Sequence, residues 1–167
     1  MLIMENLKKK IEEAVKLFKS GNLEKSERYT KDLILHNPKV VFLYNLLGLI
    51  LASQNKNDEA IKYYKIGIKI KPDHAMIYNN LGTSYKAKRD YINSEKYYKK
   101  SIDLNDKSAE AHNNLGNLYI DLNKHSDSII YFKKAINLSP NFYIAYFNLA
   151  ILFKSFGKFK ESIKYLD

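Results

Sequence analysis

Three asparagines at a constant spacing are the residues of this sequence best suited to a recognition chemistry. Asn80, Asn114 and Asn148 follow one another at equal intervals. A side-chain amide offers two N–H donors and one carbonyl acceptor. It can therefore bind both the C=O and the N–H groups of an extended peptide backbone without contacting the peptide's side chains. The series predicts reversible binding of a polypeptide rather than catalysis.

The other polar residues form no pattern that is typical of an active site or a metal site. The sequence has no cysteine, and none of its four histidines forms an i,i+4 pair that could begin a metal site. It also lacks a glycine-rich phosphate-binding loop and a Gly-x-Ser-x-Gly motif. An active site needs groups that converge in a pocket, whereas these carboxylates are scattered. We therefore expect no enzymatic activity, no metal and no cofactor.

The composition is that of one folded domain. Of the 167 residues, 46% are hydrophobic and 28% are charged, which is ordinary for a chain of about one domain. The N-terminal stretch MLIMENLKKKIEEAVKLF lacks an apolar core followed by a small-residue cleavage site, and no apolar run is long enough to cross a bilayer. We expect a cytoplasmic protein with no membrane association.

The elements that must position the asparagines repeat along the chain. The three prolines, at 38, 72 and 140, follow the spacing of the asparagines. The first two prolines are one such interval apart, and the last two are two intervals apart. This period, about 34 residues, is that of a helix–turn–helix repeat. Aligned on it, the sequence divides into four full units and one partial unit, at 7–40, 41–74, 75–108, 109–142 and 143–167.

Equivalent positions of the units carry equivalent residues, counting position 1 as the first residue of each unit. Position 8 is small, as Ala14, Gly48, Gly82, Gly116 and Ala150. Position 20 is also small, as Ser26, Ala60, Ser94, Ser128 and Ser162. Position 23 is always tyrosine, as Tyr29, Tyr63, Tyr97, Tyr131 and Tyr165. We expect the small residues to let two antiparallel helices approach closely, with large residues at positions 11 and 24 filling the space beside them.

Two stretches, IYNNLGTSYKAKRDYINSEKYYKKSIDLND and HNNLGNLYIDLNKHSDSIIYFKKAINLSP, follow the pattern of a known family closely. Over 7–167 the chain resembles a tetratricopeptide-repeat protein. The resemblance implies an all-α fold, a right-handed superhelical solenoid of antiparallel helix pairs, as a single domain over 1–167. In this family the first helix of each pair, helix A, lines the concave side. Lys10 and Glu13 depart from the pattern in the first unit, which suits a terminal cap.

The pattern predicts ten helices and the turns that join them. Each turn within a pair carries glycine or asparagine where a left-handed backbone is needed, except that Arg89 stands there in the third unit. The prolines end the second, or B, helices. The expected helices span 5–19, 23–36, 40–54, 57–70, 75–87, 91–104, 109–122, 125–138, 143–156 and 159–167.

The resemblance also implies where the asparagines lie. In the family, position 6 faces the concave groove, and the series resembles the asparagine ladder of the O-linked N-acetylglucosamine transferases, although Leu46 interrupts it in the second unit. An alternative is that asparagine is simply common at this position. Beside Asn80, Asn114 and Asn148, the residues expected to line the groove are Phe42, Asn45, Met76, Asn79, Thr83, Glu110, Asn113, Asn117, Ile144, Phe147 and Ile151. They are polar at the centre and apolar towards both ends.

Positive charge recurs in register with the repeats. The formal net charge is +10, and of the 28 basic residues only Arg28 and Arg89 are arginines. Positions 22 and 25 of the B helices form a basic ridge, which could bind an acidic partner or RNA. A solvated surface is the favoured interpretation, because Glu27 and Glu95 can pair with lysines four residues later. The ridge comprises Arg28, Lys62, Lys96 and Lys164 with Lys31, Lys65, Lys99 and Lys133.

The sequence therefore predicts a protein-interaction module that binds a peptide segment in its concave groove. A different class of function stays open, because the sequence stops partway through the fifth B helix. The chain could be the substrate-presenting part of a larger enzyme such as a glycosyltransferase or sulfotransferase. The last face of a repeat array usually needs a polar cap. We therefore also expect self-association through an apolar end formed by Ile151, Phe156 and Tyr165.

Overall fold

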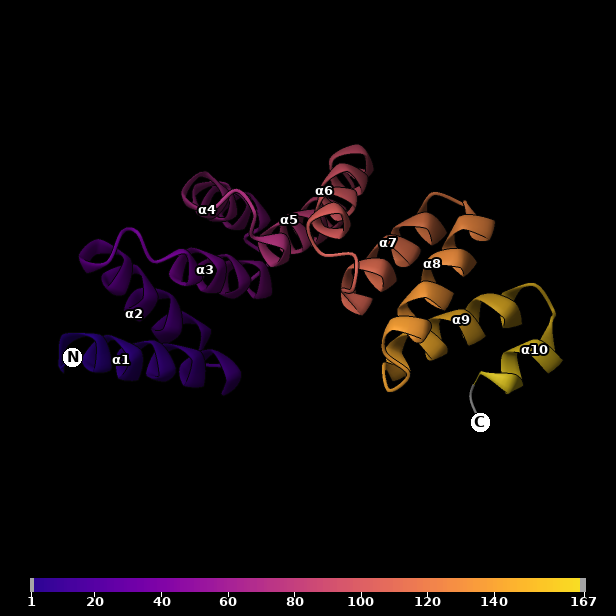
Figure 1. Ribbon diagram of the computed structural model, residues 1–167, viewed down its shortest axis with the longest axis horizontal. Coiled ribbons are helices and arrows are strands. Elements are labelled where there is room, and N and C mark those ends of the chain that lie inside the picture. The colour runs from indigo at the N-terminus through magenta and orange to yellow at the C-terminus, as the bar shows by residue number, and fades with distance from the viewer. Residues whose placement is uncertain (1, 166–167) are drawn as a thin grey trace.

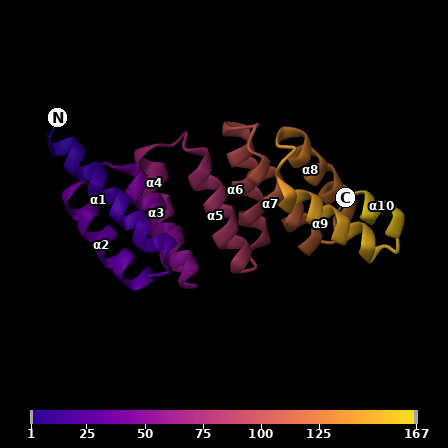
Figure 2. The same ribbon diagram turned by 90° about the horizontal axis from the view of Figure 1, so that it is seen from below.

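The described part of the chain is a row of ten α-helices joined as five antiparallel pairs (Figures 1 and 2). The computed structural model describes the backbone of residues 2–165 and the side chains of 5–165. The A helices are α1 (Leu2–Lys19), α3 (Val41–Ser53), α5 (Ala75–Ala87), α7 (Ala109–Asp121) and α9 (Tyr143–Ser155). The B helices are α2 (Leu23–His36), α4 (Asn57–Ile70), α6 (Tyr91–Leu104), α8 (His125–Leu138) and α10 (Phe159–Lys164).

These elements confirm the all-α, helical-repeat fold expected from the sequence. Most bounds match the expected ones to within a residue. The larger differences are at the two ends, where α1 begins at Leu2 and α10 ends at Lys164. Residues 166–167 of the expected last helix lie outside the described residues. No described helix has the length and apolar character that would let it cross a membrane.

The two kinds of helix occupy different layers. Each B helix from α2 to α8 packs against the A helix before it and the A helix after it. The A helices α1, α3, α5 and α7 also contact their neighbours in the row, whereas no two of the described B helices make extensive contact. The A helices therefore lie closer together than the B helices. A stack with this asymmetry curves so that its A helices are on the inner side.

In three of the five pairs, a hydrogen bond joins the small residue at position 20 to position 8. The hydroxyl of Ser94 donates to the carbonyl oxygen of Gly82 at 2.8 Å, and the equivalent serines Ser26 and Ser162 donate to Ala14 and Ala150 at 2.9 Å. The expectation that position 20 faces position 8 is thus confirmed. All three serines are buried, so each bond also satisfies a hydroxyl that would otherwise be costly to bury.

The aromatic ring at position 24 is what excludes a side chain at position 8. A Cβ atom on Gly82 would lie 2.5 Å from the Tyr98 ring, and one on Gly116 would lie 2.8 Å from the Phe132 ring. Both rings are fully buried. In the first unit position 24 is the small Thr30, and position 8 is alanine instead of glycine. The glycine is therefore required by the ring that fills the space, more than by the small residue at position 20.

The two ends of the row differ in polarity. At α1, the positions that carry core residues in later A helices are the charged and exposed Lys9, Glu13 and Lys16, as expected of a cap. At α10, Phe159 and Ile163 are exposed. In the preceding pair, His125 at the position of Phe159 packs against Phe156 of the next pair, with ring centroids 5.1 Å apart.

Of the three apolar residues expected to form the C-terminal end, two are exposed and one is half-buried. Ile151 and Phe156 are exposed, whereas Tyr165 is half-buried and stacks on Phe153 at 5.7 Å. Self-association through this end stays a prediction.

The turns within the pairs use left-handed backbone at equivalent points. Gly21, Asn55, Asn123 and Gly157 have φ values between 57° and 78°, as their residue types led us to expect. Arg89 has a φ of 60°. A side chain with a Cβ in this conformation costs about 1–2 kcal/mol, which only glycine, and to a lesser degree asparagine, avoids. The fold therefore holds Arg89 in a conformation that its residue type disfavours.

The contact between position 8 and the ring can be tested with alanine. We expect Gly82→Ala to lower the free energy of unfolding by about 1–3 kcal/mol, because its Cβ overlaps the buried Tyr98 ring. Gly67→Ala, on α4, is the control: the closest contact of its Cβ would be the flexible Cδ1 end of Ile77, at 2.8 Å. Urea unfolding followed by circular dichroism measures both. Equal losses in the two variants would contradict the assignment.

A substitution that removes the strain at Arg89 should stabilise the protein. Arg89→Gly should raise the free energy of unfolding by about 0.5–1 kcal/mol, because relief of the left-handed conformation exceeds the entropy gained by the unfolded chain. Ala87→Gly is the matched control, since Ala87 lies in α5 and has no positive φ. That variant should lose stability. A thermal unfolding curve for Arg89→Gly that lies below the wild-type curve would show that this turn is not strained.

Candidate functional site

Hydrogen bonds between asparagine side chains join neighbouring A helices at three successive junctions. Nδ2 of Asn80 donates to Oδ1 of Asn45 at 2.8 Å. The same bond joins Asn114 to Asn79 at 3.0 Å and Asn148 to Asn113 at 2.9 Å. We call these six residues the amide ladder. The amides predicted to be free for a ligand thus use one donor each to hold the next A helix.

The interruption of the series at Leu46 follows from the same pairing. Position 5 of the first unit is Ile11, which packs in the apolar cluster that contains the buried Leu46. The first junction therefore has an apolar pair where the other three have an amide pair. Both residues of this first pair are apolar, because a single amide facing an apolar side chain would be left without a hydrogen-bond partner.

The ladder keeps part of its hydrogen-bonding capacity. At position 6, Oδ1 and the second N–H of each amide have no partner among the described side chains and backbone. Asn80 is only 9% exposed, whereas Asn114 and Asn148 are half-buried and reach the surface. A ligand backbone could therefore reach the amides at the second and third ladder junctions more easily than at the first.

We call the surface formed by positions 2, 6 and 9 of α3, α5, α7 and α9, together with Phe147 at position 5 of α9, the A-helix face. At its two ends the side chains at the surface are apolar, and at its centre Glu110 and Thr83 are exposed and Asn117 is half-buried. The exposed side chains therefore change from apolar at the ends to polar at the centre, and the prediction that this surface lines a binding groove stays a prediction. The exposed apolar residues are Phe42, Met76, Ile144, Phe147 and Ile151.

Three of the residues expected to line the surface lie behind it. Asn45, Asn79 and Asn113, at position 5, are buried, because each accepts the ladder bond from the following helix. Asn79 also donates to Oε1 of Glu110 at 3.1 Å. Asn45 makes the equivalent, weaker contact with the sulfur of Met76 at 3.7 Å. At these two junctions, position 5 therefore contacts the side chain at position 2 of the next helix.

A B-helix residue that the sequence reasoning missed lies directly behind the centre of this face. The Tyr98 hydroxyl lies 3.1 Å from Oγ1 of Thr83 on α5, although the ring is buried. Burial raises the pKa of Tyr98 to about 12, so the hydroxyl stays neutral near neutral pH. The available signal was the change from phenylalanine to tyrosine at position 24, since Phe132 has no hydroxyl to place there.

The buried histidine is a packing residue. His112 stacks on Tyr131 with ring centroids 5.8 Å apart, and its Nε2 lies 3.0 Å from the Asp106 carbonyl oxygen. Tyr44, at the same position of its unit, donates to the Pro38 carbonyl at 2.9 Å. Burial lowers the pKa of His112, which favours the neutral ring. Among the residues that the structure describes, no group of three potential ligands could hold a metal ion.

The basic ridge is partly neutralised. Lys31 pairs with Glu27 and Lys99 with Glu95, each at 2.6 Å. Lys62 makes no ion pair within the described residues. Some of the tyrosines beside the ridge pack on other rings: Tyr97 stacks on Tyr85 at 5.3 Å and on Tyr78 at 6.2 Å. These contacts favour a solvated ridge over a platform for nucleic-acid bases.

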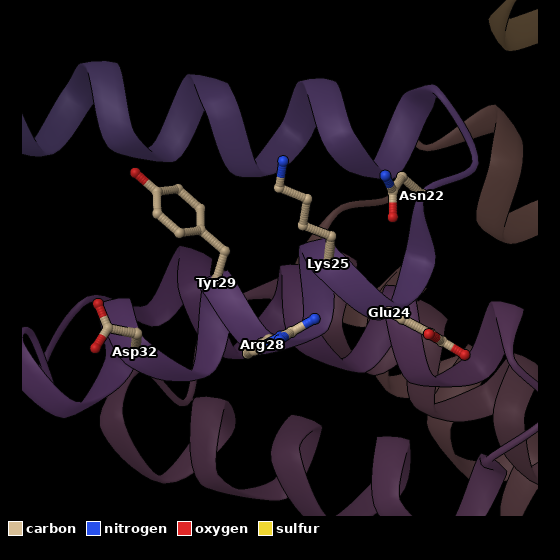
Figure 3. Close-up of a pocket in the computed structure, with 6 residues that line it drawn as sticks. All are labelled: Asn22, Glu24, Lys25, Arg28, Tyr29 and Asp32. Atoms are coloured by element: carbon tan, nitrogen blue, oxygen red, sulfur yellow. The ribbon is translucent and has the colours of Figure 1, made fainter.

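A surface depression lies apart from the A-helix face. Six residues of α2 and the turn before it line this depression (Figure 3). Their charges are mixed, and none of them belongs to the amide ladder. It lies at the N-terminal end of the row and shares no residue with the A-helix face. The lining residues are Asn22, Glu24, Lys25, Arg28, Tyr29 and Asp32.

Comparisons with known proteins agree with this architecture. Models of the tetratricopeptide repeat match residues 73–141 and 131–164, and a model described as TPR repeat matches 48–88. No curated protein sequence matches this chain. The matched ranges run together over 48–164.

Solved structures of similar fold come from diverse sources. A thermophilic TPR protein of Thermus thermophilus, TTC0263, superposes with a TM-score of 0.84 at 18% identity, over 95% of this chain and 87% of that one. MamA of Desulfovibrio magneticus RS-1 gives 0.77 at 18% identity, over 96% and 90%. The APC/C hetero-tetramer Cut9-Hcn1 gives 0.84 at 16% identity, over 92% and 30%. At these identities the likeness establishes the fold alone.

The contribution of the amide ladder to the free energy of unfolding can be measured without a ligand. We expect Asn80→Ala to lower the free energy of unfolding by about 1–3 kcal/mol, because it leaves Oδ1 of the buried Asn45 without a donor. The double variant Asn45→Ile/Asn80→Leu, which copies the first junction, should recover most of that loss. Asn117→Ala, which removes an amide without a described hydrogen bond, should change stability little. A double variant no more stable than Asn80→Ala would contradict the pairing.

Proposed function

Since the chain carries tetratricopeptide repeats over residues 48–164, we propose that it is an interaction module that binds an extended segment of another protein along the A-helix face. Repeats of this fold commonly mediate contacts between proteins. One of the solved structures above is, by its printed name, an assembly of two different proteins, Cut9 and Hcn1. That precedent supports the class of function and leaves the partner of this chain open.

The observation that carries the proposal is the unused half of the amide ladder. Asn114 and Asn148 each offer an acceptor and a donor at the surface, which is the pair of groups needed to bind one peptide unit of a ligand. Helices packed side by side lie about 10 Å apart. An extended chain rises about 3.3 Å per residue. A ligand crossing the A helices would therefore meet equivalent amides about every three residues.

The apolar side chains beside the amides supply a second contribution. Ile144, Phe147 and Ile151 lie at i, i+3 and i+7 of α9, so they form one exposed stripe. Exposed apolar stripes rimmed by polar groups are typical of binding surfaces. A ligand could bury this stripe while its backbone bonds to Asn148. The backbone hydrogen bonds would contribute affinity for any extended ligand, and the stripe would add affinity for ligands with apolar side chains.

Panning a display library of unstructured peptides, each long enough when extended to cross the A helices from α3 to α9, tests the proposal. The variant Ile144→Asp places a charge on the A-helix face, at a side chain that is 57% exposed. We expect it to weaken binding of the selected peptides at least tenfold, as measured by fluorescence polarisation. Ile130→Asp is the matched control, since Ile130 is 51% exposed but belongs to the B helix α8. It should bind as the wild type does.

Two results would contradict the proposal. Selected peptides that bind equally well to Ile144→Asp and lose affinity for Ile130→Asp would place the binding surface on the B helices. A library that yields no binder at all would remove the proposal. Neither substitution changes a buried residue, so loss of fold would not imitate loss of binding. A thermal unfolding curve for each variant checks this.

A further inference from the structure

One row of side chains on the A-helix face differs from helix to helix while the amides beside it stay constant. Position 2 carries Phe42, Met76, Glu110 and Ile144 on successive A helices, and all four are exposed. The ladder repeats the same amide pair at the three junctions between these helices. A constant row suits recognition of the backbone, which every ligand shares. A variable, exposed row suits recognition of the ligand's side chains.

Glu110 is the one member of this row that carries a charge. It is exposed, and within the described residues no lysine, arginine or histidine nitrogen lies within ion-pair distance of its carboxylate. Its Oε1 accepts a hydrogen bond from Nδ2 of the buried Asn79 at 3.1 Å. That bond holds the carboxylate in place and leaves the rest of its acceptor capacity towards solvent. The nearby Thr83 and Tyr98 hydroxyls are neutral.

The neighbours of Glu110 in the row are apolar. Met76 on α5 and Ile144 on α9 flank it, and each is 57% exposed. Asn45 contacts the sulfur of Met76 at 3.7 Å, which is a weaker contact than that of Asn79 with Glu110. From α5 to α9 the row therefore presents an apolar, an acidic and an apolar side chain. With helices about 10 Å apart, the interval between them corresponds to about three residues of an extended ligand.

We propose that the ligand of the A-helix face is an extended segment with a lysine or arginine that pairs with Glu110. Apolar side chains about three residues before and after it contact Met76 and Ile144. This inference rests on the proposed function, because it specifies the ligand of the same surface. The pairing replaces water around a pre-oriented carboxylate with a charge-assisted hydrogen bond.

The net charge of the protein does not oppose this preference at the contact itself. The formal charge of +10 comes from lysines, of which the ridge residues lie on the B helices. The described A helices from α3 to α9 hold few charges, and two of those, Lys86 and Asp121, pair with each other at 2.9 Å. At about 0.15 M salt, exposed charges are screened over about 8 Å. The local carboxylate therefore governs the side chain placed against it.

Three fluorescent peptides of equal length test the inference. They share two apolar residues at the flanking positions and differ only in the central residue, which is lysine, glutamine or glutamate. We expect the wild type to bind the lysine peptide about tenfold more tightly than the glutamate peptide, as for a hydrogen bond to a charged group. Glu110→Gln should reduce this ratio to near one, and Glu110→Lys should invert it.

The matched control changes the net charge without changing the face. Glu24→Lys alters the formal charge by the same amount as Glu110→Lys, but it lies on the B helix α2. It should keep the wild-type preference for lysine. If Glu24→Lys shifts the ratio as much as Glu110→Lys does, the preference comes from overall charge and the inference is wrong.

The remaining outcomes separate this inference from the proposed function. If all three peptides bind equally, and Ile144→Asp weakens them all, the A-helix face binds peptides without reading charge, so the inference alone fails. If no peptide binds and the library also yields no binder, both fail. A preference for the glutamate peptide that falls steeply with salt would instead point to the basic ridge.

Discussion

The fold depends on one steric constraint, the contact between the backbone at position 8 of an A helix and the aromatic ring at position 24 of its B helix. Gly82 and Gly116 leave no room for a Cβ against the rings of Tyr98 and Phe132. The ring fills the space that the missing side chain leaves, so the pair is close and densely packed. Because the three central pairs share this local contact, their geometry repeats, and the amides of successive A helices lie in the same register.

Because of this register, asparagine, which is otherwise unfavourable within a helix, links neighbouring A helices. Asparagine disfavours a helix interior because its side chain competes for backbone hydrogen bonds. In this fold the competition is avoided, since each ladder amide bonds to another amide on the next helix. The same group cannot be both fully committed to the fold and free for a ligand. The ladder divides these roles within one side chain: one N–H holds the row together, and the carbonyl oxygen with the second N–H stays available at Asn114 and Asn148.

Charge is distributed between the two layers in a way that suits this division. The lysines of the ridge lie on the B helices, partly paired with Glu27 and Glu95, where they keep the outer surface hydrated. The A-helix face holds exposed apolar side chains, amides and the single carboxylate of Glu110. A surface of this kind is favourable for contact with another polypeptide, because little charge must be desolvated there. The face with a single charge and the lysine-rich layer are thus consequences of one two-layer architecture.

Much of this was determined by the sequence alone. The constant repeat period, the small residues at positions 8 and 20 and the turn residues predicted the helices nearly to their ends, because these depend on contacts within one repeat. The change from apolar to polar along the A-helix face was also predictable from residue types. The hydrogen-bond partners were not. Asn80 pairs with Asn45, and Asn79 with Glu110, across junctions that depend on how one pair is rotated on the next. Only the tertiary structure fixes that rotation, and it decided which amides are buried, which reach the surface, and that the Tyr98 hydroxyl lies beside Thr83.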